Sequence, residues 1–412
     1  MPIVTKADLH SIDWEISSAC QATCPVCLRR DPTTLQMADV DQGYTTLREF
    51  KRALKHTTGI KAINFCGNIG DPMTNPEIAD IVEYIVRTQP DCQVRVSTNG
   101  GIGSVESYER LAAAGVTITF GIDGYREVNS WYRAGVKWEA IDRNIRAFKN
   151  NVSGPWQITL QFLAFDQNIH DLPNVVAWAR GVGVNTLFVK ESYGPARIAV
   201  QDRNDQHTHT LTKLNTDQYR PLLNKIYPSH HWDSLLAAWA ELNLAEPLLP
   251  KAPKTQTLAF NHPGREKFRF PEGAPYEIYE TDVLLAAKSQ DVHCISWDDI
   301  ERRNKKVLFI FITYDMYVMP CCFISGRFTG NRMTKGLVTH YHNVNGEPRQ
   351  LLDTVDAEML NKIHSIGIDK FSLRSYSLSE ILNSGVLNQL VYQDLETNNK
   401  LAICGKFCKK CN

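Results

Sequence analysis

The chain has 412 residues, 43% of them apolar and 22% charged, which is the composition of a globular protein long enough for about two or three domains. Lysine plus arginine number 45, as do aspartate plus glutamate, and this balance argues against a broad nucleic-acid or membrane-binding surface. The first residues, MPIVTKADLH, lack the apolar core of a signal peptide, and no apolar run reaches the roughly 18 residues of a membrane span. We therefore expect a cytoplasmic protein in which cysteines stay reduced.

Strand-like and helix-like segments alternate through the first half of the chain. Short apolar runs predict six strands, which begin near Ser11, Lys61, Gln93, Thr117, Trp156 and Asn185. Apolar residues at helical spacing predict helices over residues 46–54, 76–85, 138–148 and 172–183. The first begins with a capping box from Thr46 to Glu49, the second has Pro76 in its first turn, and the last stops at a glycine.

This alternation predicts an α/β fold, because strands joined by helices pair in parallel through right-handed crossovers. Six units are too few for a closed eight-stranded barrel, so an open sheet or a partial barrel is expected over residues 10–195. Glycines and small polar residues follow four successive strands: a cysteine-rich loop, then GNIGDP (67–72), STNGG (97–101) and GIDG (121–124). Single βα turns also favour such residues, but four in a row predict one ligand site at the carboxyl ends of the strands.

Eleven cysteines fall into two groups and two isolated positions. The first group lies in SSACQATCPVCLRR, which starts at Ser17 and holds Cys20, Cys24 and Cys27. Clustered cysteines in a reducing compartment indicate metal ligands, but a structural zinc site normally takes four ligands and disulfides take thiols in pairs. Three thiolates therefore suggest a metal centre with one position left open. Cys66 and Cys92 each lie in an apolar run, where a cysteine is usually a small buried hydrophobic residue.

These features resemble the radical SAM enzymes over about residues 10–195. The resemblance is carried by Cys20-x3-Cys24-x2-Cys27 after the first strand, by IGDP (69–72) where the family usually has GGEP, and by STNG, FGIDG and WYRAGVKWEAIDRNI from Trp131. The chain differs in having Asp71 instead of the commoner Glu, and Gly121 where many members have Ser. The resemblance implies a partial (βα)6 TIM-type barrel, which we assign to residues 1–195.

A member of this family would use the three cysteines to hold a [4Fe–4S] cluster whose fourth iron is chelated by S-adenosylmethionine. An electron from a reductant such as flavodoxin or ferredoxin would cleave S-adenosylmethionine to a 5′-deoxyadenosyl radical, which abstracts hydrogen from the substrate. Candidate contacts to S-adenosylmethionine are the backbone of Gly70 for its amino group, Arg133 for its carboxylate, and Asp71, Asn99 and Asp123 for its amine, ribose or adenine. A solvated charge at a helix start is the alternative for Arg133.

Residues 196–290 differ in character, since they are polar and then interrupted by prolines. We interpret them as a linker or insertion with some helix and with possible substrate contacts. They contain two histidine pairs, His207 with His209 and His230 with His231, which we expect to be surface residues rather than metal ligands.

The C-terminal part, residues 291–412, contains the second cysteine group. Cys294 precedes a predicted hairpin that turns at Asp315 and ends at Cys321 and Cys322. A helix is predicted next, over residues 377–392, with a capping box from Ser377 to Glu380. The tail after it contains Cys404, Cys408 and Cys411. This order is similar to the twitch or SPASM extension of radical SAM enzymes, which often has glycine at the hairpin turn where this chain has Met316.

The resemblance implies a smaller α+β domain, a hairpin plus a helix, that holds one auxiliary [4Fe–4S] cluster. The favoured ligands are Cys294, Cys321, Cys408 and Cys411, with Cys404 as a replacement for either tail cysteine and Cys322 as a bystander. A structural zinc site is the alternative, because four thiolates suit either metal.

Two classes of function follow from these interpretations. The first is a radical enzyme that modifies a peptide or natural product, or one that oxidises or epimerises a small molecule such as an amino sugar. Because the first motif cysteine is residue 20, we expect no peptide-recognition domain before it, which weakens the peptide alternative. The second class is a binding or scaffold protein stapled by zinc, which the neutral charge and the four ligand-like strand ends disfavour.

Overall fold

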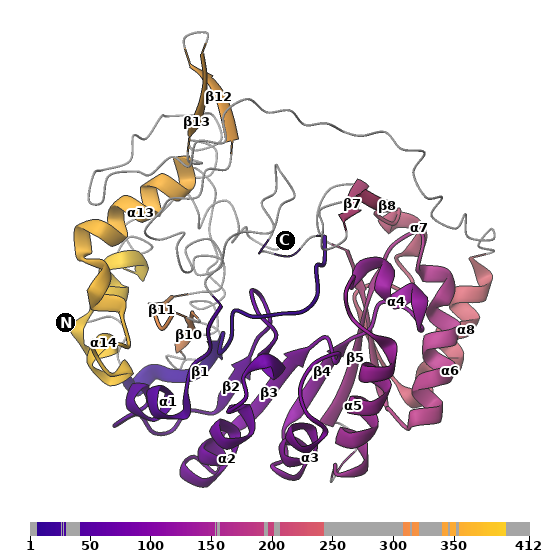
Figure 1. Cartoon of the computed structure of the whole chain (residues 1–412), viewed down its shortest axis with the longest axis horizontal. Coiled ribbons are helices and arrows are strands. Elements are labelled where there is room, and N and C mark those ends of the chain that lie inside the picture. The colour runs from indigo at the N-terminus through magenta and orange to yellow at the C-terminus, as the bar shows by residue number, and fades with distance from the viewer. Residues whose placement is uncertain are drawn as a thin grey trace.

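Six parallel strands form the centre of a nine-stranded mixed sheet (Figure 1), as the sequence predicts. They are β1 (Leu9–Trp14), β2 (Ala62–Phe65), β3 (Gln93–Thr98), β4 (Thr117–Gly121), β5 (Ile158–Ala164) and β6 (Thr186–Glu191), and they lie side by side in chain order. The computed structural model describes residues 6–25, 27, 29, 42–152, 154, 157–192, 197–201, 207–242, 308–313, 315–320, 340–344, 347–351 and 354–392.

Helices cover one side of this sheet (Figure 1). They are α1 (Leu47–Ala53), α2 (Ile78–Thr88), α3 (Val105–Ala113), α5 (Trp138–Asn150) and α6 (Leu172–Val182). Alternate strand residues such as Val96, Phe120 and Leu160 are buried beneath them. The intervening residues face the other side of the sheet, and along β3 every one of these is exposed. The fold is therefore an α/β partial barrel with an apolar outer layer, which confirms the predicted fold class.

The local signals that predict these helices are mostly confirmed. The Thr46 hydroxyl accepts the Glu49 N–H at 3.2 Å, the Glu49 carboxylate accepts the Thr46 N–H at 2.9 Å, and α6 ends at Gly183 with a φ of 81°. The prediction for Pro76 was wrong: Glu77 is the N-cap of α2, so the proline precedes the helix. The helix predicted over 377–392 has its capping box at Ser377 but is divided at Gly385, where φ is 80°.

The sheet continues beyond residue 195 at both edges. β9 (Lys225–Pro228) pairs antiparallel with β6, while β10 (Leu308–Ile312) pairs parallel with β1 and antiparallel with β11 (Val318–Met319). The C-terminal hairpin predicted to turn at Asp315 is therefore present and belongs to the same sheet as the N-terminal strands. The division of the chain at residues 195 and 290 does not follow an edge of this sheet and stays a prediction.

The remaining elements lie around this sheet. They are the hairpins β7 (Arg197–Gln201) with β8 (His207–Thr212) and β12 (His340–Val344) with β13 (Glu347–Leu351), the helices α4 (Glu127–Tyr132), α7 (Thr216–Tyr219), α8 (Trp232–Glu241), α13 (Thr354–Ile366) and α14 (Leu378–Ser384), and the short helices η1 (Lys6–Asp8), η2 (Pro72–Thr74), η4 (Ile169–Asp171), η5 (Ser229–His231), η6 (Ile368–Phe371) and η7 (Asn388–Tyr392). No helix in these described ranges is long and apolar enough to cross a membrane.

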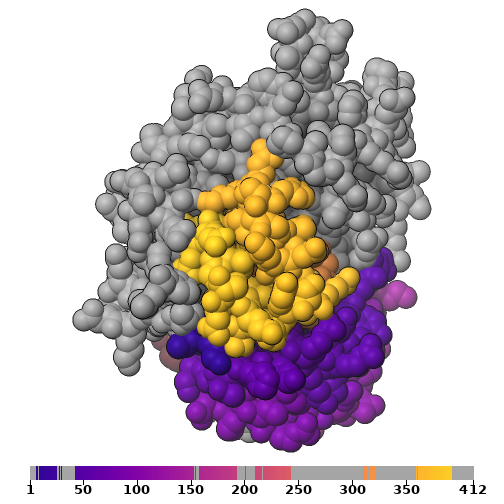
Figure 2. All heavy atoms as spheres, turned by 90° about the vertical axis from the view of Figure 1, so that its left-hand side faces the viewer, coloured from indigo at the N-terminus to yellow at the C-terminus, as the bar shows by residue number. Residues whose placement is uncertain are grey.

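The C-terminal helices pack against the N-terminal part of the molecule. Figure 2 shows the C-terminal helices, in yellow, directly against the N-terminal residues, in indigo. Buried side chains between residues 359 and 391 belong to the same hydrophobic cluster as Trp14 and Phe50. Met316 links the two parts: its sulfur accepts the Thr45 hydroxyl at 3.6 Å, and its carbonyl accepts the Leu373 N–H at 2.8 Å. Met316 has a φ of 73°, so the hairpin turn adopts the left-handed conformation that glycine favours, without a glycine.

Candidate functional site

A cavity of about 300 Å³ lies at the carboxyl ends of the central strands. It is lined by residues from all six parallel strands or the loops that follow them, namely Cys20, Ala22, Cys24, Cys27, Arg29, Cys66, Gly67, Asn68, Ile69, Gly70, Asp71, Ser97, Thr98, Asn99, Thr119, Gly121, Arg133, Gln161 and Lys190. Cys20, Cys24 and Cys27 therefore line one cavity together with four of the five residues predicted to contact S-adenosylmethionine. In the described part of the chain, no three His, Cys, Asp or Glu side chains are close enough to hold a single metal ion.

The thiols in this cavity are partly removed from water. Cys20, Cys24 and Cys27 are half-buried, and burial raises the pKa of the Cys20 thiol to about 11 and that of the Cys24 thiol to about 12. The Cys20 and Cys24 thiols therefore carry their protons at neutral pH unless a positive centre displaces them. Cys66 also lines the cavity and is only partly buried, contrary to its prediction as a buried hydrophobic residue, whereas Cys92 is buried as predicted.

The loop that carries the cysteines is held by hydrogen bonds from the neighbouring strand ends. The Asp71 N–H donates to the Ala19 carbonyl at 2.7 Å, and the Thr23 N–H donates to the Ala134 carbonyl at 2.9 Å. Asn99 adds a contact to the sulfur itself, because its amide nitrogen lies 3.5 Å from Cys20 Sγ while its oxygen accepts from Gln21 at 2.7 Å. Asn99 thus lies at the cysteine loop, and its contact to S-adenosylmethionine stays a prediction.

Gly70 and Asp71 are both buried, and the Gly70 N–H and the Asp71 carboxylate already have partners. A Cβ on Gly70 would lie 2.1 Å from the Ser17 carbonyl oxygen, so glycine is needed for the backbone to approach the cysteine loop. The Asp71 carboxylate accepts from the Thr98 hydroxyl at 2.8 Å, the Asn99 N–H at 2.8 Å and the Met73 N–H at 3.0 Å. Asp71 therefore joins the ends of β2 and β3. Burial raises the pKa of its carboxyl group, and this effect is larger than the opposing effect of the hydrogen bonds.

Glu15 is a buried site residue that the sequence reasoning missed. It follows β1 directly, is fully buried, and its Oε1 accepts the N–H groups of Ile69 at 2.6 Å and Gly70 at 3.0 Å. Burial raises the pKa of Glu15 to about 8, against the opposing effect of these hydrogen bonds. The available signal was an acidic residue inside the apolar run of the first strand.

Asp123 and Arg133 form an ion pair beside the cavity. Asp123 Oδ2 lies 2.7 Å from Arg133 Nε, and the other carboxylate oxygen accepts the Leu163 N–H at 2.7 Å. The Asp123 side chain is fully buried and does not line the cavity, whereas Arg133 does. A Cβ on Gly121 would lie 2.2 Å from Arg133 Nη2, so the missing side chain at Gly121 makes room for the guanidinium.

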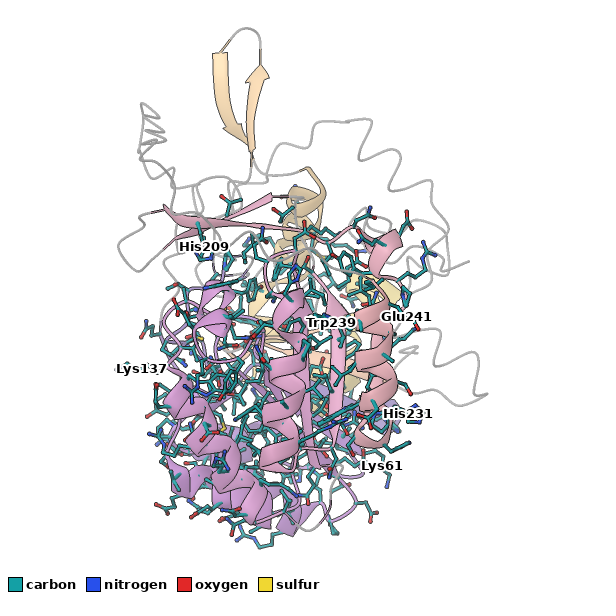
Figure 3. All side chains as sticks on the ribbon, turned by 90° about the vertical axis from the view of Figure 1, so that its right-hand side faces the viewer. Lys61, Lys137, His209, His231, Trp239 and Glu241 are labelled. Atoms are coloured by element: carbon teal, nitrogen blue, oxygen red, sulfur yellow. The ribbon has the colours of Figure 1, made fainter. Side chains whose placement is uncertain are left out.

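Other predicted residues lie apart from this cavity or outside the described ranges. Cys294, Cys321, Cys322, Cys404, Cys408 and Cys411 all fall outside the residues that the structure describes. His209 binds the Trp131 carbonyl through Nε2 at 2.8 Å, and its partner in the predicted pair has no described side chain. Figure 3 places His231 at the start of α8, far from His209, and both His230 and His231 are exposed, as predicted.

Comparison with known proteins identifies part of the chain. Residues 14–179 match the family model described as the radical SAM superfamily. No curated protein sequence matches the chain significantly. Solved structures that match the chain include Streptococcus suis SuiB bound to S-adenosylmethionine, at 12% identity and a TM-score of 0.46. This match covers 83% of the present chain and 63% of the SuiB chain. Another is anSMEcpe with bound AdoMet and the Cp18Cys peptide, at 11% identity and a TM-score of 0.45. This match covers 97% of the present chain and 88% of the anSMEcpe chain.

These structural similarities are distant. The chain spans 63% of the length of SuiB, and BtrN in complex with AdoMet and 2-DOIA matches over only 37% of this chain, with a TM-score of 0.26. At such identities and TM-scores, the neighbours carry no information about what this chain acts on.

Proposed function

We propose that the chain is a radical SAM enzyme that cleaves S-adenosylmethionine reductively at a cluster held by Cys20, Cys24 and Cys27, in line with the superfamily match over residues 14–179. The observation that carries this proposal is the presence of all three thiols on one cavity with the polar ends of β2, β3 and β4. Three thiolates in a partly dry cavity fit a [4Fe–4S] cluster with one iron left open. When bound, the cluster supplies one electron to S-adenosylmethionine, which yields methionine and a hydrogen-abstracting 5′-deoxyadenosyl radical.

The surrounding residues fix the geometry of this site. Glu15 and Asp71 hold the loops after β2 and β3 by hydrogen bonds to backbone N–H groups, and Asn99 contacts the sulfur of Cys20. Arg133 is the proposed partner of the methionyl carboxylate, because it lines the cavity while Asp123 holds its Nε. Asp123 is thus proposed as a positioning residue for Arg133 instead of a direct contact.

The inner face of the sheet supports a polar substrate. Ser97, Thr119, Gln161 and Lys190 lie on neighbouring strands and line the cavity. Polar side chains at this position offer hydrogen bonds and one positive charge where a closed barrel would have an apolar core. We therefore propose hydrogen abstraction from a polar substrate in peptide or natural-product modification, with a small molecule such as an amino sugar as the alternative and with flavodoxin or ferredoxin as the electron source.

We also propose one auxiliary [4Fe–4S] cluster, with Cys294, Cys321, Cys408 and Cys411 as ligands and Cys404 as a possible replacement in the tail. The β10–β11 hairpin supports this proposal, because it ends at Met319 and Pro320, directly before Cys321, and lies at the edge of the sheet next to β1.

The test of the proposed cleavage is the triple variant Cys20→Ala, Cys24→Ala, Cys27→Ala. After anaerobic reconstitution with iron and sulfide, wild type should convert S-adenosylmethionine to 5′-deoxyadenosine in the presence of dithionite, and the triple variant should form none. Cys92→Ala is the matched control, because Cys92 is buried and does not line the cavity. Cleavage at the wild-type rate in the triple variant would contradict the proposal.

A further inference from the structure

Arg29 lies two residues beyond the last cysteine of the motif and is almost fully buried, with 6% of its surface exposed. One terminal nitrogen donates to the Cys20 carbonyl at 3.2 Å, and the other donates to the Ala22 carbonyl. Its backbone N–H lies 3.5 Å from Cys27 Sγ. One side chain therefore ties the end of the cysteine loop to its beginning.

The charge of Arg29 faces the three thiols. Its guanidinium interacts electrostatically with the sulfur atoms of Cys27, Cys20 and Cys24, and it lines the same cavity. Within the described ranges, no carboxylate forms an ion pair with Arg29. Arg133, the other cavity arginine, is in contrast paired with Asp123 at 2.7 Å. Arg133 also interacts electrostatically with Cys24 and Cys20, but Asp123 offsets its charge. Arg29 is thus the cavity guanidinium that acts on the thiols without a paired carboxylate among the described residues.

A buried positive charge acts on the redox properties of a thiolate-bound centre. Reduction adds one negative charge, and a nearby cation stabilises the reduced form more than the oxidised form, most strongly where water is excluded. Arginine suits this role because its guanidinium remains protonated at all ordinary pH values and its planar fork can bind two carbonyls at once. Hydrogen bonds and charges around the ligands are recognised means of setting the potential of iron–sulfur centres.

We propose that Arg29 is a positioning residue that closes the cysteine loop and, through its charge, raises the reduction potential of the cluster bound there. This inference depends on the proposed function, since it requires a redox-active cluster at Cys20, Cys24 and Cys27. It assigns a role to a residue outside the three-cysteine motif and apart from the contacts proposed for S-adenosylmethionine.

The experiment is a potentiometric titration of the reconstituted full-length enzyme, followed by the electron paramagnetic resonance signal of the reduced cluster. Arg29→Gln removes the charge and keeps a hydrogen-bonding group, whereas Arg29→Lys keeps the charge and loses the fork. Arg110→Gln is the control, because Arg110 is a partly exposed arginine on α3 that pairs with Asp80 and Glu83. Iron per chain is measured in parallel for each variant.

We expect the ratio of reduced to oxidised cluster in Arg29→Gln, at a fixed ambient potential, to fall at least about tenfold, which corresponds to roughly 59 mV for one electron. Arg29→Lys and Arg110→Gln should keep the wild-type potential. A wild-type potential in an Arg29→Gln variant with full iron content would overturn the proposal. If Arg29→Gln holds no cluster, Arg29→Lys decides: full iron content at the wild-type potential shows that the site requires the charge and supports the proposal, and a tenfold shift despite the retained charge refutes it.

The proposed function fails in a different way. The wild type should show a reducible cluster signal, and this signal should disappear when Cys20, Cys24 and Cys27 are replaced. If it does not, the assignment of the three-cysteine site is itself wrong. A normal signal with an unchanged potential in Arg29→Gln refutes only the role of Arg29.

Discussion

Replacing Glu15 should separate its role as a hydrogen-bond acceptor from its role as a buried acid. Glu15→Gln keeps an oxygen that can accept the N–H groups of Ile69 and Gly70, but it cannot ionise. Glu15→Ala removes the acceptor and leaves both amides without it in a buried position. The two variants should therefore differ both in overall stability and in how that stability depends on pH.

The expected magnitudes follow from burial and from the raised pKa. An unsatisfied buried N–H costs about 1–3 kcal/mol, so the two amides left by Glu15→Ala should lower the free energy of unfolding by roughly 2–6 kcal/mol. The pKa of Glu15 is raised from its ordinary 4.5 to about 8 by burial. Between these pH values the unfolded chain releases the proton and the folded chain keeps it, so the wild type loses stability as pH rises. At about 1.36 kcal/mol per pH unit, the upper limit of this loss is roughly 5 kcal/mol.

Equilibrium urea unfolding at pH 5 and pH 8 measures both effects, with the fluorescence of the fully buried Trp14 as one of the signals. Subtracting the wild type from Glu15→Gln cancels the titration of every other group. The stability of Glu15→Gln relative to wild type should increase between the two pH values by a few kcal/mol. A difference that stays constant across this range would show that Glu15 is ionised in the folded protein, and the reasoning from burial would be refuted.

Two further predictions concern the cofactor contact and the C-terminal cysteines. Gly121→Ser should displace the Arg133 guanidinium, which lies 2.2 Å from the position of the new Cβ, and should weaken S-adenosylmethionine binding roughly tenfold or more in equilibrium dialysis. Gly181→Ala, which meets no atom within 4 Å, should leave affinity unchanged, and an unaltered affinity in Gly121→Ser would contradict the proposed role of Arg133. Truncation before Ala402 removes Cys404, Cys408 and Cys411 and should reduce iron from about eight to about four per chain while reductive cleavage persists. A wild type with about four irons and a zinc would indicate a structural metal site instead.

The six central strands could be predicted because each is a short apolar run bounded by turn residues, and four helices could be predicted from their apolar spacing. Helix α3 was missed, since only three of its residues, Tyr108, Leu111 and Ala112, are buried and form a short apolar stripe. The pairing of β10 with β1 could not be predicted, because local sequence predicts a strand without specifying which strand it pairs with. Gly385 interrupts a helix that apolar periodicity alone predicts as continuous.

The candidate site was predictable in composition but not in its internal contacts. The motif identified the three cysteines and the loops around them, and the structure brings these onto one cavity. The partners of Asp71 and Asp123 depend on side-chain packing between strands: Asp71 is bound to Thr98 and Asn99, and Asp123 is bound to Arg133. Residue type and spacing cannot tell a buried carboxylate that supports a loop from one that contacts a ligand.

The parallel pairing of β1 with β10 also has a consequence for synthesis of the chain. Leu9 and Leu308 are paired in this register, although the ribosome makes residue 308 long after residue 9. Until then β1 has β2 on one side and an open edge on the other, and β1 is the strand that precedes the loop with Cys20, Cys24 and Cys27. Strand pairing over such a sequence separation forms late, so the nascent domain passes through a stage in which its own C-terminal segment has yet to cover the strand that leads to the thiols.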